Sequence, residues 1–188
     1  MSKKKEKMEF KIDKKELAKT GKFLIWWVLL FLVIYYIIIA LAGWQALEGI
    51  TAFSSEKVLK SFGVLKIGVD YSQSTVLMSV EGKRIEISEL CTGMLETVLL
   101  FTAILASFGI SWKKRIFGAC GALIFGFAFN QLRIFVSIMQ ILSTEIQIAE
   151  LTHDFFFRLS LLIVIAGYYY LWFKKATKKG QLTKQKQN

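Results

Sequence analysis

Residues 23–42 read FLIWWVLLFLVIYYIIIALA and carry no charge. About 20 apolar residues suffice for a helix to cross the ~30 Å hydrocarbon core of a bilayer. Three further stretches are similarly apolar: Leu95–Ile110, Ile116–Leu142 and Phe155–Phe173. The first of these three is the shortest and reaches spanning length only if its helix begins near Cys91. The sequence therefore predicts an α-helical polytopic membrane protein with about four transmembrane helices.

The basic residues gather at the ends of these spans. Nine lysines precede the first span, residues 113–115 (Lys-Lys-Arg) separate the second and third, and six lysines follow the fourth. Four crossings bring the three groups to one side, which the positive-inside rule assigns to the cytoplasm. We expect a cell-membrane protein with cytoplasmic tails over residues 1–22 and 174–188 and a membrane domain over 23–173. The net charge of +11 then reflects topology and indicates no nucleic-acid partner.

The triplet Ala40-Leu41-Ala42 resembles a signal-peptidase site. The apolar run before it has about 20 residues, longer than the roughly 7–15 residues of a signal-peptide core. We therefore expect the first helix to remain uncleaved.

The long outer loop, residues 44–90, has the period of strands. Thr75–Val80 and Lys83–Ser88 alternate apolar and polar residues around Glu81-Gly82, a two-residue hairpin signal. Val64–Val69 could add a third strand.

In the register of this hairpin, Val76 faces Ile87 and Met78 faces Ile85, which gives one apolar face. The pattern predicts a small extracytoplasmic antiparallel sheet between the first and second spans, lying on the outer membrane surface. Its last strand leads directly into Cys91.

Cys91 lies in the run Ser88-Glu89-Leu90-Cys91-Thr92-Gly93-Met94, at the predicted outer border between water and lipid. Free backbone N–H groups at a helix start stabilise a thiolate. A small apolar residue at a helix start is the structural alternative, and the strand-to-helix junction favours a nucleophile. Cys120 is expected near the cytoplasmic end of its span, too far away for a disulfide.

Arg133 lies inside an apolar run of the third span, about 25 Å from Ile116 at 1.5 Å per residue. An intramembrane charge is costly and marks a functional site by default. Asn130 precedes it on the same side of the helix, at spacing i and i+3. A structural ion pair with Glu96 is one reading of Arg133, and stabilisation of an oxyanion beside Cys91, with Glu96 orienting the guanidinium, is the favoured one.

His153 is the single histidine of the chain and opens the fourth span from the outer side. It is either a polar helix end or the base for a thiol, with Glu150 placed to orient its ring. Arg158 lies five residues later, about 140° round a helix. Asp154 offers it an ion pair on another face, so Arg158 is interpreted as structural.

The common motifs of metal, nucleotide and serine-hydrolase chemistry do not occur. The sequence lacks HExxH, CxxC, a Walker loop and GxSxG. One histidine and two cysteines also supply too few ligands for a convincing metal site. We expect neither a metal nor another cofactor.

Three motifs in order resemble the archaeosortase/exosortase family: Cys91-Thr92-Gly93-Met94, then Asn130-Gln131-Leu132-Arg133-Ile134, then His153. The match covers roughly residues 75–173. The resemblance implies a membrane cysteine protease-transpeptidase that cuts C-terminal sorting signals from exported proteins and transfers the new C-terminus to a lipid.

Carried over from the family, Cys91 would be the nucleophile, Arg133 the transition-state stabiliser and His153 the base. Some archaeal members use a second arginine in place of the histidine, so His153 and Arg158 both remain candidates for the third role. A non-enzymatic membrane scaffold, whose outer sheet docks a partner, is the alternative function. The recognition motif, the lipid acceptor and the oligomeric state stay open.

Overall fold

A computed structural model of the chain describes residues 14–72, 75–143 and 157–185. Its elements, in chain order, are α1 (Lys14–Ala42), α2 (Trp44–Ser61), β1 (Ile67–Asp70), β2 (Val76–Val80), β3 (Lys83–Ile87), the 3₁₀ turn η1 (Glu89–Cys91), α3 (Met94–Ala106), α4 (Trp112–Ser143) and α6 (Phe157–Gln185).

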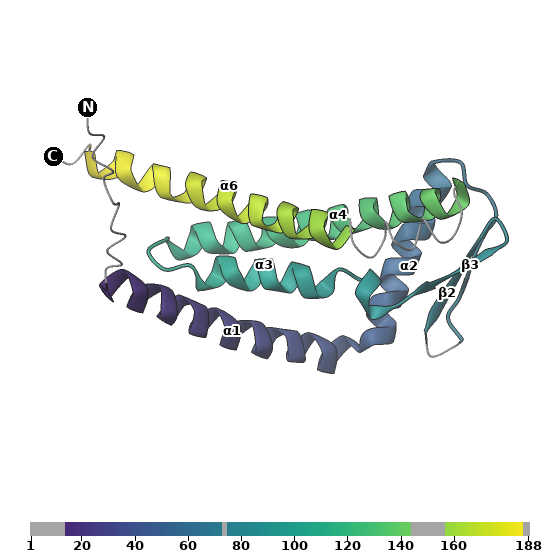
Figure 1. Ribbon diagram of the computed structural model, residues 1–188, viewed down its shortest axis with the longest axis horizontal. Helices are drawn as coiled ribbons and strands as arrows, with labels where there is room; N and C mark the ends of the chain where they lie inside the picture. The colour runs from purple at the N-terminus through teal and green to yellow at the C-terminus, as the bar shows by residue number, and fades with distance from the viewer. Residues whose placement is uncertain (1–13, 73–74, 144–156, 186–188) are drawn as a thin grey trace, which may run out of the picture.

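Four helices lie along the long axis of the molecule (Figure 1). α3 contacts α1, α4 and α6, so it is the inner helix of this bundle. α2 crosses the bundle at one end, where the sheet also lies. The beginning of α1, the connection from α3 to α4 and the end of α6 gather at the opposite end. The described basic residues next to these three points therefore flank one end of the bundle.

Two of the four predicted spans are confirmed by length and composition. Within the described part of the chain, Leu17–Ala42 and Trp112–Ser143 are long and apolar enough to cross a membrane. α3 begins at Met94 rather than near Cys91, and its 13 residues correspond to about 20 Å of helix. It is therefore shorter than a full span. α6 covers the predicted fourth segment but is not among the two helices that qualify.

The predicted hairpin is confirmed in its register. Val76 pairs with Ile87 and Met78 with Ile85 in an antiparallel three-stranded sheet of order β1-β2-β3. The turn residues Glu81 and Gly82 both have positive φ, as a two-residue type I′ hairpin requires. The third strand, expected over 64–69, is observed as β1.

The segment 44–61 was read as part of the β loop, and this prediction is wrong. It forms α2, whose buried stripe includes Glu48, Thr51 and Ser55. Because these side chains are polar, the hydrophobic period that normally reveals a helix is missing. Burial in α2 therefore cannot be inferred from apolar residues alone.

The apolar face of the sheet is buried against two helices. Val76, Met78 and Ile87 form one core with Leu59 of α2 and Ile138 near the end of α4. Cys91 packs against the edge of this core. The hairpin, α2 and the end of α4 thus fix the position of the segment that carries the thiol.

Small residues on α4 allow close packing against α3 and α6. A Cβ on Gly118 would lie 2.0 Å from Nε1 of Trp172, and one on Gly126 would lie 2.6 Å from Oγ1 of Thr97. Ala122 is completely buried between them in a second core. Small residues at this spacing let neighbouring helices approach closely.

Candidate active site at the turn before α3

The chain passes from β3 into α3 through a tight turn that contains Cys91. The Cys91 N–H donates to the Ser88 carbonyl at 2.8 Å, and the Thr92 N–H to the Glu89 carbonyl at 3.2 Å. Cys91 therefore ends η1 and lies three residues before Met94, the first residue of α3. The sequence indicates a position at the start of the helix, and the structure places Cys91 before it.

Gly93 joins the turn to α3 and lies close against Asn130 of α4. Its φ of 63° lies in the left-handed region, which disfavours any side chain. A Cβ at this position would also lie 2.6 Å from Cγ of Asn130. Glycine is required here for both reasons, which explains in physical terms why a glycine stands two residues after Cys91.

Asn130 and Arg133 both bind the backbone of this turn. The Asn130 Nδ2 donates to the Cys91 carbonyl, and the Arg133 Nη2 donates to the Leu90 carbonyl, each at 2.9 Å. Asn130 is 1% and Arg133 6% exposed, so neither side chain faces lipid. The expectation that both residues lie on the side of the helix facing Cys91 is confirmed.

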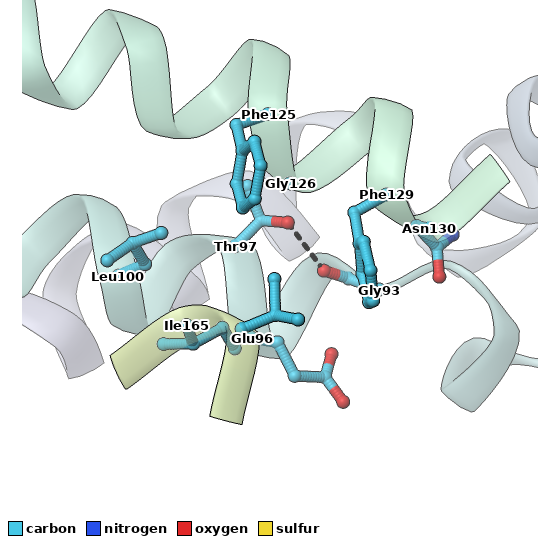
Figure 2. Close-up of a pocket in the computed structure, with 10 residues that line it drawn as sticks. Gly93, Glu96, Thr97, Leu100, Phe125, Gly126, Phe129, Asn130 and Ile165 are labelled. Carbon is cyan, nitrogen blue, oxygen red and sulfur yellow. Dashed lines mark hydrogen bonds between the residues drawn. The ribbon is translucent and has the colours of Figure 1, made fainter. Parts of the chain in front are cut away.

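The expected pairing of Arg133 with Glu96 is not found among the described residues. Arg133 binds a backbone carbonyl instead. Glu96 lies on the first turn of α3, and its carboxylate points away from Phe125 and Phe129 of α4 (Figure 2). No sequence pattern could reveal that the Leu90 carbonyl is the partner of Arg133, because every residue carries a backbone carbonyl.

A small cavity between α3, α4 and α6 adjoins the turn and is lined in part by Gly93, Glu96 and Asn130 (Figure 2). Its volume of about 10 Å³ is at the lower limit for one water molecule. Thr97 Oγ1 donates to the Gly93 carbonyl at 2.7 Å along this wall. A peptide could not enter here, so a substrate would have to reach Cys91 from another side.

Four buried polar atoms near this turn have no hydrogen-bond partner in the described structure: Oε2 of Glu48, Oδ1 of Asn130, Nε2 of Gln131 and Nε of Arg133. Three of them lie within one turn of α4. Buried polar groups are normally paired, so an unpaired group calls for an explanation. Asn130 and Arg133 bind the turn that carries Cys91, and the open acceptor of the one and the open donor of the other fit a site completed by water or substrate.

Sequence reasoning missed the contribution of α2 to this region. Ser55 Oγ donates to Oε1 of Gln131 at 2.8 Å, which ties α2 to α4. Burial raises the pKa of Glu48, the Val76 N–H opposes this shift, and Glu89 and Glu86 add to it. Gln131 lies within the Asn130–Arg133 motif, and a polar residue in this apolar span is the one sequence signal for a further polar contact.

The Cys91 thiol is half-buried and reduced. The Ser88 Oγ lies 3.8 Å from its Sγ, within hydrogen-bonding distance for sulfur. Cys120 is also a free cysteine and is exposed on α4. The prediction that the two cysteines do not form a disulfide is confirmed.

The other predicted site residues lie partly beyond the described structure. His153, with its neighbours Glu150 and Asp154, falls in the undescribed segment 144–156. Arg158 belongs to the first turn of α6, and its side chain is not described. No cluster of three or more potential metal ligands occurs in the described ranges. The identity of the base therefore stays a prediction.

The fold and this turn define a class: a helical membrane protein that holds a reduced cysteine between a small sheet and a buried Asn–Arg pair. The transmembrane exosortase family model matches residues 17–168, most of the chain. The chain therefore belongs to the transmembrane exosortase family, and membership implies a membrane transpeptidase-type role with cysteine chemistry at the level of the family. No curated protein and no solved structure matches the chain.

Proposed function

We propose that the protein is a membrane cysteine protease-transpeptidase that cleaves C-terminal sorting signals of exported proteins and transfers them to a lipid. The observation that carries the proposal is the pair of hydrogen bonds from Asn130 and Arg133 to the carbonyls of Cys91 and Leu90. They join the two motifs of the sequence at one point. A buried guanidinium beside a reduced thiol is suited to acyl transfer.

The proposed reaction begins with proton transfer from the Cys91 thiol to His153. The sulfur then attacks the carbonyl carbon of the scissile peptide bond, and the carbonyl oxygen becomes an oxyanion. The C–N bond breaks as His153 returns the proton to the departing amine, which leaves a thioester on Cys91. A lipid hydroxyl or amine attacks this thioester, its proton passes to the base, and the thiolate is released.

Arg133 has two tasks in this mechanism. One N–H holds the Leu90 carbonyl and thereby the backbone next to Cys91. A guanidinium has five N–H donors, and the Nε of Arg133 is buried without a partner in the part of the chain that the structure describes. The remaining donors are proposed to bind the oxyanion, where such a group contributes about 10²–10³-fold to the rate.

The proposed topology has both tails in the cytoplasm and the Cys91 turn at the outer face. The distribution of basic residues at one end of the bundle supports it. A membrane-impermeant thiol reagent applied to intact cells should then label Cys91 but not Cys120. Labelling of Cys120 alone would contradict this orientation.

The test of function is mass spectrometry of the C-terminus of a candidate substrate. Such a protein carries a short motif, an apolar helix and a basic end at its C-terminus. We expect a shortened, lipid-bearing C-terminus with the wild-type protein and with Cys120→Ala, and an intact tail with Cys91→Ala. Immunoblots should show that all three proteins accumulate. Processing by the Cys91→Ala protein would instead favour the non-enzymatic scaffold.

A further inference from the structure

A groove between α4 and α6 lies at the end of the bundle far from the Cys91 turn. Its volume is about 680 Å³, within the range of about 300–1,000 Å³ of typical ligand sites. The walls are apolar and include Phe117 and Leu171, which are 84% and 66% exposed. Gly118 and Gly121 form part of the lining, and Trp172 and Tyr168 of α6 pack closely against them.

The rim of the groove is basic. Lys113, Lys114 and Lys175 line it, and no acidic side chain is among its described lining residues. The sequence has no Asp or Glu over residues 97–144 or 155–188, which contain all of α4 and α6. The positive charge at this rim therefore has no neutralising partner on either helix.

Backbone geometry adds to this positive charge. Lys113 and Lys114 belong to the first turn of α4, where the helix dipole also favours an anion. Lys114 Nζ donates to the Ala176 carbonyl at 2.7 Å and so links the two helices. Trp172, whose Nε1 donates to the Lys114 carbonyl at 3.4 Å, lies beside the lysines, as indole rings do at membrane interfaces.

We propose that this groove binds one anionic phospholipid, with its phosphate at Lys113 and Lys175 and an acyl chain along Phe117 and Leu171. The apolar walls match the chain, and the unneutralised lysines match the head group. Basic pockets between transmembrane helices bind anionic lipid head groups in this manner. The proposal does not depend on the catalytic role of Cys91, because the groove lies at the other end of the bundle.

Native mass spectrometry of the purified full chain would measure this binding. The probes are phosphatidylglycerol and phosphatidylcholine with identical acyl chains. We expect selective retention of phosphatidylglycerol. The variant Lys113→Gln/Lys175→Gln should bind it roughly ten- to thirty-fold more weakly, because each such lysine contributes about a five-fold factor. Lys114 is left unchanged because it links the helices.

Two matched variants separate the groove from overall charge. Lys57→Gln/Lys66→Gln removes the same charge from exposed positions outside the groove and should bind as the wild type does. Lys113→Arg/Lys175→Arg keeps the charge and should retain binding. An equal loss in the Lys57/Lys66 variant, or a loss in the arginine variant, would overturn the proposal.

Three further results would also overturn it. Equal binding of phosphatidylcholine would remove the role of the lysines, and displacement of the lipid by inorganic phosphate would indicate a simple anion site. A dimer that dissociates in the Lys113/Lys175 variant would show that a second copy of the chain covers the groove instead.

Discussion

At each end of α3, an arginine of α4 binds backbone carbonyls, but the two arginines differ in one respect. Before α3, Arg133 of α4 donates to the Leu90 carbonyl. After α3, Arg115 of the same helix donates through Nε to the Ile110 carbonyl and through Nη1 to the Leu105 carbonyl, at 2.8 and 3.1 Å. The Nε of Arg115 is thus bonded, whereas the Nε of Arg133 is buried and has no hydrogen-bond partner among the described residues.

This difference separates a structural arginine from a candidate catalytic one. Arg115 uses its donors on the backbone carbonyls of Leu105 and Ile110, at and after the end of α3. Arg133 binds the Leu90 carbonyl before α3, and its Nε remains unpaired among the described residues. Leaving a buried donor unpaired costs about 1–3 kcal/mol, and proteins commonly accept such a cost at functional sites. The comparison predicts that matched changes at the two ends will both lower stability but will differ in their effect on activity.

The largest effect is expected from Gly93→Ala, compared with Gly109→Ala on the other side of α3. Both glycines have positive φ, so each alanine costs about 1–2 kcal/mol of backbone strain. Only Gly93 faces Asn130, whereas nothing lies within 4 Å of a Cβ on Gly109. We expect Gly93→Ala to abolish substrate processing and to lower the unfolding temperature further than Gly109→Ala, measured by thermal denaturation in detergent.

Similar processing by the two glycine variants would contradict a special role for the approach of Gly93 to Asn130.

Arg133→Ala and Arg115→Ala form the second comparison. Arg133→Ala removes one hydrogen bond from a charged group to a backbone carbonyl and Arg115→Ala removes two. Each such bond is worth about 1.5–3 kcal/mol, so both variants should lose stability, and Arg115→Ala at least as much as Arg133→Ala. Processing should fall at least about a hundred-fold in Arg133→Ala and much less in Arg115→Ala. The rate of substrate cleavage, normalised to folded protein, distinguishes the two.

Arg133→Lys sharpens this comparison. Lysine keeps the positive charge but lacks the planar fork of donors. We expect it to recover part of the stability of the wild type while cleavage stays slow. Full cleavage with lysine would mean that charge alone is sufficient.

A double-mutant cycle tests the contact between Gly93 and Asn130, with a smaller expected effect. Asn130→Ala removes the donor to the Cys91 carbonyl, at a cost of about 1–3 kcal/mol. It also removes the Cγ and Oδ1 atoms that a Cβ on residue 93 would meet. The destabilisation of Gly93→Ala/Asn130→Ala should therefore be smaller than the sum of the single changes. Strict additivity in denaturation midpoints would show that the two residues do not interact.

The smallest effect is expected at Glu48. Burial raises its pKa above the ordinary value of 4.5, so the folded state disfavours the carboxylate. The stability of the protein therefore falls as the pH rises from that value through the raised pKa, and the loss is complete above it. Glu48→Gln should raise the unfolding temperature by a few degrees at neutral pH and progressively less as the pH falls toward 4.5. A constant difference across this range would contradict the shift.

The hairpin and the Arg133 site differ in how far the sequence predicts them. The hairpin register was predictable because Val76, Met78, Ile85 and Ile87 alternate around a turn with its own signature. Asn130 and Arg133 stood out because polar groups are costly in an apolar span. The partner of Arg133 was not predictable, because a backbone carbonyl leaves no trace in the sequence.

The helix α2 was missed for a related reason. Its buried side includes Glu48, Thr51 and Ser55, so the pattern resembles a polar loop. Ser55 becomes intelligible only through its hydrogen bond to Gln131, 76 residues away. Hydrogen bonding across such a separation depends on the fold and not on local pattern.

The central claim is that Cys91 forms a thioester with the substrate, and hydroxylamine trapping tests it most directly. Hydroxylamine attacks a thioester, releases the thiol and leaves a hydroxamate on the acyl group. In membranes that contain the substrate, the wild-type and Cys120→Ala proteins should yield a substrate fragment ending in a C-terminal hydroxamate, identified by mass spectrometry, and Cys91→Ala should yield none. A hydroxamate formed with Cys91→Ala, or its absence with a wild-type protein that still cleaves the substrate, would contradict the claim.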